Sequence, residues 1–259
     1  MNTFRSYLTP NPFPIVLACL AIHGVAVSGA ELIPVPDGGG NGDTWSHVPF
    51  SGLTLSDVPP IRMQQAYDAG SFSSIPDGGW ITGIWFVSDP DVGRNWTASL
   101  PRVEFTMSVT DRSVDALSTI FDENVGMSSV SVRPLGPLSL TSVDKGSVVQ
   151  VDFQTPFLYY PSAGNLLMEI KNWDPTCCPG VPQLNAGPLD AWNIVGDPVS
   201  RVYAIGDANA RTGTADTLGL TTYFMVTPIP EPSTTVLLGA GFFALGWSWL
   251  RRRKHTEKR

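Results

Sequence analysis

The sequence predicts an all-β domain, an antiparallel two-sheet β-sandwich that is jelly-roll-like, and three observations predict it. Short segments rich in β-branched and aromatic residues follow one another between residues 61 and 227. The chain holds 25 glycines and 23 prolines, which supply the turns between such segments. No long stretch with a helical period separates the strands, whereas helices between strands would predict an α/β fold.

Residues 31–60 are expected to form a lead-in segment before the domain, which we place at residues 61–227. Residues 37–43 are rich in glycine and predict a solvated turn. Two aspartates of this turn could contact a cation, but their spacing does not match a calcium loop. Residues 61–69 contain good helix formers and are the one stretch of the domain where a short helix is expected.

The strands are predicted from apolar–polar alternation and from the turn residues at their ends. Residues 103–110 alternate four apolar and four polar side chains, as a strand with one buried face does. Pro134 is expected to end one strand, and Pro156 favours an edge strand or a bulge. The predicted strands span residues 80–87, 103–110, 130–133, 148–154, 166–171, 201–205 and 218–226.

Residues 1–30 have the pattern of a secretory signal peptide. Arg5 supplies the positive charge, residues 15–27 are mostly apolar, and small residues precede a cleavage site after Ala30. Lipid attachment at Cys19 is an alternative, which is disfavoured because Cys19 lies in the middle of the apolar stretch. The pattern predicts that the middle of the chain crosses the inner membrane.

Residues 228–259 form a separate C-terminal segment. Its three prolines fix φ and remove backbone donors, so its first part is expected to be extended. Residues 234–250 carry no charge and would form a helix about 25 Å long, which predicts a single short transmembrane helix. Residues 251–259 form a basic tail that favours the cytoplasmic side.

Pro230, Glu231 and Pro232, followed by the apolar run and the basic tail, resemble the PEP-CTERM sorting signal of exported bacterial proteins. The resemblance implies recognition by a membrane processing enzyme called an exosortase. It implies a protein anchored in the inner membrane before processing and found at the cell surface or outside the cell afterwards. A plain C-terminal anchor with a proline-rich stalk is the alternative.

Charge and histidine content exclude several functions for the middle of the chain. Residues 31–229 carry 21 acidic and 9 basic side chains, a net charge of −12, which disfavours nucleic acid as a partner. His47 is the only histidine in this range. Hydrolases with a serine or cysteine nucleophile need a base, usually histidine, and catalytic zinc takes several histidines or cysteines. We therefore predict no enzyme activity, no cofactor, no metal site and no catalytic residue.

Two patterns keep a carbohydrate-related function open as the alternative. Glu104 and Glu169 could supply the carboxylate pair of a glycan-cleaving enzyme, although alternation assigns both to an outer sheet face. Trp80, Trp85 and Trp96 could stack on sugars if their rings are exposed, but rings of this kind are more often buried in a core.

Two further features concern bound ions and thiols. Residues 89–95 begin like a calcium turn but lack its distal acid. Cys177 and Cys178 are adjacent and would enter an oxidising compartment on export, so they form a candidate disulfide. Free thiols or intermolecular bridges are the alternatives, and no Cys-x-x-Cys spacing predicts redox catalysis.

These patterns together predict an exported protein of the cell surface or extracellular matrix with a non-enzymatic binding or structural role. The expected partners are the exosortase-type enzyme, the membrane through the C-terminal helix, and extracellular polysaccharide as a candidate ligand.

Overall fold

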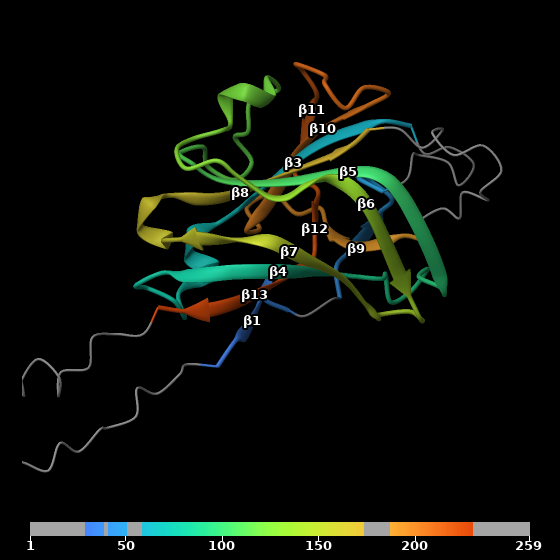
Figure 1. The fold of residues 1–259 in the computed structure, drawn as a ribbon, viewed down its shortest axis with the longest axis horizontal. Helices are drawn as coiled ribbons and strands as arrows, with labels where there is room; N and C mark the ends of the chain where they lie inside the picture. The colour runs from blue at the N-terminus through green and yellow to red at the C-terminus, as the bar shows by residue number, and fades with distance from the viewer. Residues whose placement is uncertain (1–28, 39–40, 51–58, 174–186, 230–259) are drawn as a thin grey trace, which may run out of the picture.

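The computed structural model describes residues 29–38, 41–50, 59–173 and 187–229, which form an all-β structure (Figure 1). Strand accounts for 55% of it, and the described residues contain no α-helix, so the predicted all-β class is confirmed. Within these ranges, no helix is long and apolar enough to cross a bilayer. Residues 1–28, Cys177, Cys178 and the segment from Pro230 onward lie outside the described residues.

The strands form three antiparallel sheets. The first has the order β1-β13-β4-β7, the second β11-β10-β3-β8-β5-β6, and the third β12-β9-β2. The strands are β1 (Glu31–Val35), β2 (Thr44–Ser46), β3 (Ile61–Tyr67), β4 (Gly79–Val87), β5 (Trp96–Thr110), β6 (Val130–Ser142), β7 (Val148–Tyr159), β8 (Asn165–Asn172), β9 (Leu189–Trp192), β10 (Val199–Ile205), β11 (Thr214–Asp216), β12 (Gly219–Leu220) and β13 (Thr222–Pro228). Three short 3-10 helices, η1 (Ala69–Phe72), η2 (Phe121–Glu123) and η3 (Pro161–Ala163), connect them.

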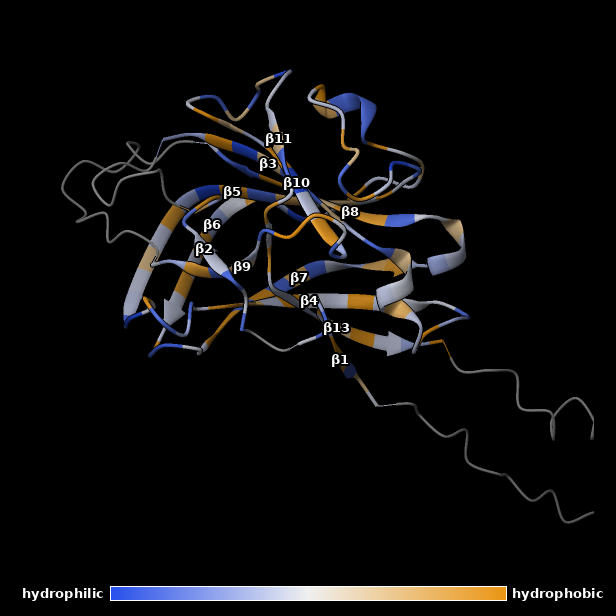
Figure 2. Ribbon diagram, turned by 180° about the vertical axis from the view of Figure 1, so that it is seen from behind, coloured by the Kyte–Doolittle hydropathy of each residue, from blue (hydrophilic) through white to orange (hydrophobic). Residues whose placement is uncertain are grey.

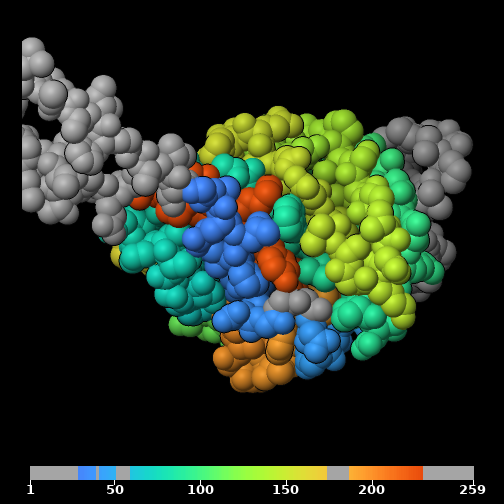
Figure 3. All heavy atoms as spheres, turned by 90° about the horizontal axis from the view of Figure 1, so that it is seen from below, coloured from blue at the N-terminus to red at the C-terminus, as the bar shows by residue number. Residues whose placement is uncertain are grey.

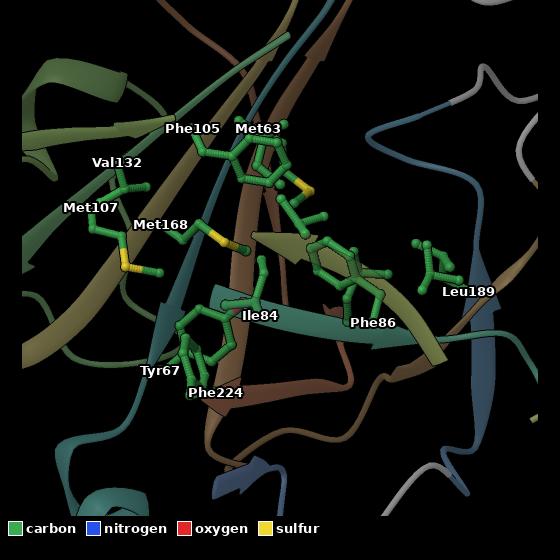
Figure 4. Close-up of a cluster of buried hydrophobic side chains, with 14 of the residues drawn as sticks. Met63, Tyr67, Ile84, Phe86, Phe105, Met107, Val132, Met168, Leu189 and Phe224 are labelled. Carbon is green, nitrogen blue, oxygen red and sulfur yellow. The ribbon is translucent and has the colours of Figure 1, made fainter. Parts of the chain in front are cut away.

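One continuous hydrophobic core lies between the four-stranded and six-stranded sheets (Figure 4). Because side chains alternate along each strand, the sheets contribute every second residue to it, an alternation that Figure 2 shows as bands of colour. Aromatic rings meet across the interface, as in the edge-to-face contact of Tyr67 and Phe224, whose centroids are 4.8 Å apart. This packing of two large sheets agrees with the predicted sandwich, while the small third sheet was not predicted.

Six of the seven predicted strands are present, and several are longer than the sequence pattern indicated. The single strand predicted at residues 218–226 is wrong, because this range forms two strands, β12 and β13, which belong to different sheets. β6 continues through Pro134 and Pro137, so Pro134 does not end it. Because β6 lies at the edge of its sheet, prolines there need not donate to a neighbouring strand on the open side. Pro156 lies in β7, which is also an edge strand, at a register shift between Asp152 and Phe157.

The prediction of a short helix at residues 61–69 is wrong, because Ile61–Tyr67 forms strand β3. All seven of its residues are buried, so the strand shows no apolar–polar alternation. The reason is that both faces of this part of the sheet are covered. A second, smaller core of Ala66, Leu117, Phe121, Leu167 and Val202 packs on the outer face.

The segment expected as a lead-in contributes two strands to the fold. Glu31–Val35 forms β1, which pairs with β13 from Glu31 opposite Val226 to Val35 opposite Thr222. Thr44–Ser46 forms β2, which pairs with β9 in the third sheet. The folded unit therefore begins close to Ala30.

A buried ionic network holds the loop around η2 on the outer face of the six-stranded sheet. Glu169 accepts hydrogen bonds from Nε of Arg62 (3.0 Å) and the amide of Gln64 (2.8 Å), and Lys171 Nζ lies 3.1 Å from its other oxygen. The Arg62 guanidinium also contacts Asp122 of η2 and lies 4.5 Å above the centre of the Phe121 ring. The strand residues thus satisfy one another's polar groups inside the protein, while Asp122 of the loop reaches the buried guanidinium from the solvent side.

We expect Arg62→Ala to lower the free energy of unfolding by about 2–3 kcal/mol, because Glu169 loses one charged partner inside the protein and keeps only Lys171 and Gln64. Arg112→Ala is the matched control, since its ion pair with Glu123 is exposed and should contribute only about 0–1 kcal/mol. Urea unfolding of residues 31–229, followed by circular dichroism, measures both. Equal losses in the two variants would contradict the stabilising role of the network.

Candidate functional site

The outer face of the four-stranded sheet carries a row of aromatic and polar side chains that points away from the core. Trp85 on β4 lies opposite Tyr223 on β13 and opposite Gln150 on β7. Directly opposed residues in neighbouring strands have Cβ atoms about 5 Å apart, so the side chains of Trp85 and Tyr223 leave the sheet next to each other. We call the surface formed by Trp85, Tyr223, Gln150 and Asp152 the aromatic row.

Polar groups flank the rings of the aromatic row. The amide of Gln150 donates to Asp152 at 2.7 Å, and both side chains are exposed. Trp85 and Tyr223 are half-buried. Atoms of β1 and β13 lie at the surface on this side of the molecule (Figure 3). Flat rings next to hydrogen-bonding groups can bind a partner that is apolar on one face and polar at its edges.

The three tryptophans singled out in the sequence have different environments. Trp80 is 44% exposed and lies at the beginning of β4, beside the last residues of β13. Trp85 belongs to the aromatic row, and Trp96 is only 6% exposed within the core. For Trp80 and Trp85, which share β4, alternation could not predict which sheet face each side chain occupies, because a bulge between Ile81 and Gly83 shifts the register.

Glu104 and Glu169 lie on adjacent strands of the six-stranded sheet and on the same face. Glu104 is opposite Lys171, and Glu169 is opposite Thr106, so the two acids are offset by two residues. Glu169 is buried and engaged by three side chains, whereas it was expected on a solvated face. Its observed contacts are those of a structural anchor.

The turn at residues 89–95 is organised by one carboxylate. Asp89 is buried, and its Oδ1 accepts hydrogen bonds from the backbone N–H groups of Asp91 (2.8 Å) and Val92 (2.7 Å). The side chain of Asp89 therefore caps the turn by accepting from the backbone of the residues that follow it, as aspartate commonly does. In the part of the chain that the structure describes, no group of three or more acidic, histidine or cysteine side chains is placed to hold a metal ion.

Asp190 is a buried acid in the third sheet that the sequence pattern did not reveal. Its oxygens accept hydrogen bonds from the backbone N–H of Gly42, at 2.9 Å, and from the hydroxyl of Thr221. Burial raises the pKa of Asp190, and the nearby charges of Asp89 and Asp43 raise it further, while the two hydrogen bonds oppose the shift. A single aspartate beside apolar residues gives no sequence signal of such a site.

An open hollow of about 570 Å³ lies between β1 and η1. Two carboxylates in its lining already serve the local fold, since Glu31 accepts the hydroxyl of Ser74 at 2.5 Å and Asp68 accepts the N–H of Gly70 at 2.8 Å. These contacts join the beginning of β1 to the segment around η1. The hollow is therefore part of an acidic end of the domain.

The two ends of the domain emerge side by side. Ala30 is exposed and directly precedes β1, and Glu31 lies opposite Val226 near the end of β13. After β13, the N–H of Ile229 donates to the carbonyl of Gly78 at 3.2 Å. The folded structure thus extends to the residue before Pro230. The predicted motif residues Pro230, Glu231 and Pro232 follow immediately, outside the described range.

The family model of the PEP-CTERM protein-sorting motif matches residues 228–253. The matched range contains Pro230, Glu231, Pro232 and the apolar run, so the resemblance inferred from the sequence is confirmed. The match begins at Pro228, the last residue of β13. No curated protein and no solved structure matches the chain.

The raised pKa of Asp190 predicts how Asp190→Asn changes stability with pH. Because the folded state holds this proton more tightly than the unfolded chain, wild-type stability falls as pH rises from the ordinary value of 3.8 to the raised pKa. Asparagine does not titrate, and it can still accept from Gly42 and donate to Thr221. The stability of the variant relative to wild type should therefore increase with pH across this window and level off above it. Urea unfolding at a series of pH values measures the difference, and a flat or falling difference would contradict the assignment.

Proposed function

We propose that this chain is a cell-surface or extracellular-matrix protein that acts there by binding or as a structural component, without enzyme activity. It would be exported, anchored through the apolar run 234–250, and then processed by an exosortase. The signal peptide at residues 1–30 would direct the export.

The observation that carries the proposal is the sorting motif at residues 228–253. Such a signal implies a protein that is exported and held in the membrane until exosortase acts on it. Its position supports the same route, because the signal starts where β13 ends. A folded β domain is followed directly by the segment that the processing enzyme would recognise.

The contacts of the described acids support a role without catalysis. Glu169 anchors a loop through Arg62, Asp89 caps a turn, and Asp190 links the third sheet to the segment at Gly42. Each carboxylate has a structural task that catalysis would compete with. The outer face of the four-stranded sheet carries exposed polar side chains, Gln150 and Asp152, beside the half-buried rings of Trp85 and Tyr223, an arrangement that suits binding.

We expect Glu231→Ala to stop C-terminal processing while leaving the protein anchored. The substitution keeps all the prolines and the apolar run, so only the charge that a receptor could recognise is removed. Tags before and after residues 234–250 distinguish the fragments on an immunoblot of the producing cell. Glu257→Ala, in the basic tail, is the control for loss of one negative charge. Unchanged processing of the Glu231 variant would reduce the segment to a plain anchor.

A second candidate function is carbohydrate binding at the aromatic row. The observation that favours it is the pair of neighbouring rings, Trp85 and Tyr223, flanked by the exposed amide of Gln150. Sugar rings present an apolar face and polar edges, which match a stacking surface flanked by hydrogen-bonding groups. The acidic balance of residues 31–229 favours a neutral glycan over an anionic one.

We expect Trp85→Ala to weaken binding of the producing cell's neutral polysaccharide about tenfold, which corresponds to about 1.4 kcal/mol of lost stacking. Gln150→Ala should weaken it less, and Trp45→Ala should leave it unchanged because Trp45 lies on β2 of another sheet. Affinity electrophoresis of residues 31–229 measures all three. Equal effects of the Trp85 and Trp45 variants would exclude the aromatic row as the binding surface.

A further inference from the structure

We propose that the end of the domain where β13 stops rests on the membrane surface for as long as the C-terminal segment is attached. We call this surface the exit end and define it by Gly78, Trp80, Tyr160, Pro228 and Ile229. The occupant we assign to it is the headgroup layer of a zwitterionic bilayer. This inference rests on the proposed function, because it requires residues 234–250 to be inserted in that bilayer.

The length of the connecting chain limits how far the domain can be from the membrane. Ile229 is hydrogen-bonded to Gly78 in the folded domain, and the charge-free run begins at Thr234. Five residues of extended chain span at most about 18 Å. The headgroup layer itself occupies about 5–7 Å of each side of a bilayer. The exit end therefore lies no more than about 13 Å beyond the headgroups, so contact with them is within reach of the tether.

Two exposed aromatic rings are located at this end. Trp80 is 44% exposed and lies opposite Thr227, one residue before β13 ends. Tyr160 is 40% exposed, and its ring lies so close to Gly78 that a Cβ on this glycine would be 2.5 Å from Cδ1 of the ring. Tryptophan and tyrosine favour the membrane–water interface, because one part of each ring system is apolar and another forms hydrogen bonds.

The charges around the exit end select the kind of lipid. Glu31, Asp68 and Asp77 lie on the segments that begin or end here, and Glu31 and Asp68 line the acidic hollow beside β1. These carboxylates repel anionic headgroups. Zwitterionic phospholipids carry an ammonium group at their outer edge, which an acidic surface can approach. The surface therefore fits a zwitterionic bilayer.

Because the tether between Ile229 and Thr234 is short, even a weak contact is sufficient to keep the exit end on the membrane surface. A group held on a short tether meets its partner at an effective concentration in the millimolar range, and this advantage disappears when the tether is cut. Two rings alone would not hold a free domain on a membrane. Cleavage of the C-terminal segment would therefore release the exit end from the surface without any change in the domain's structure.

The test uses the mature chain, residues 31–259, in lipid nanodiscs of phosphatidylcholine, part of which carries a nitroxide on its headgroup. The nitroxide quenches tryptophans near the headgroups, and the chain has eight tryptophans, including Trp247 and Trp249 next to the basic tail. Trp80→Phe should lower the fraction of fluorescence that is quenched, because it removes a ring in contact with the bilayer. Trp45→Phe should raise that fraction. The Trp45 ring is also exposed (45%), but it lies on β2 in the third sheet. This sheet contains β12, which leads into the beginning of β13, whereas the exit end is where β13 stops. Trp45 is therefore remote from the exit end.

The two proposals fail in different ways. If the mature chain does not incorporate into nanodiscs, the proposed anchoring by residues 234–250 is wrong, and the proposed surface contact is wrong with it. If the chain incorporates but Trp80→Phe raises the quenched fraction as Trp45→Phe does, anchoring stands and the contact of the exit end is wrong. Both substitutions replace an exposed ring by a smaller ring, so both variants are expected to fold.

Discussion

The fold depends on the pairing of β13 with both of its neighbours. β13 is the last strand of the described chain, yet it lies inside the four-stranded sheet between β1 and β4. Its inward side chains Thr222, Phe224 and Val226 are fully buried in the interface between the two large sheets. The sheet cannot close until this strand is present. In an exported chain, the domain would therefore complete its core only after residue 228 had crossed the membrane.

Buried polar contacts fix the position where β12 passes into β13. The side-chain amide of Gln65 on β3 donates to the carbonyl of Leu220 (2.9 Å) and accepts from its N–H (2.8 Å). Tyr67, two residues along, forms a hydrogen bond between its hydroxyl and that of Thr222 at 3.0 Å. These contacts satisfy backbone and hydroxyl groups inside the core and therefore specify the register of the last strand. Burial raises the pKa of Tyr67, so its hydroxyl stays protonated inside the core.

The two large sheets differ in how their outer faces are used. The face of the six-stranded sheet at β3 and β8 is covered by the loop around η2, which the network of Arg62 and Glu169 holds in place. On the four-stranded sheet, Gln150, Asp152 and Trp80 point outward and are exposed. The outer face of the four-stranded sheet thus keeps exposed polar and aromatic side chains, whereas the face at β3 and β8 is covered. β13 of this sheet ends at Pro228, the residue at which the match to the sorting motif begins.

The sequence by itself determined the fold class, most of the strands and the sorting signal, because each depends on local order along the chain. Period-two alternation predicts a strand wherever one face is buried, as in residues 103–110, and Pro230, Glu231 and Pro232 are recognised by their position before an apolar run. Tertiary structure alone decided the role of Ile61–Tyr67, whose polar residues Arg62, Gln64 and Gln65 are buried on two different faces. A strand covered on both sides has no alternation, and its partners Glu169 and Leu220 lie more than a hundred residues away. Distance along the chain also hid β1, which pairs with β13, and Asp190, which accepts a hydrogen bond from Gly42, 148 residues away.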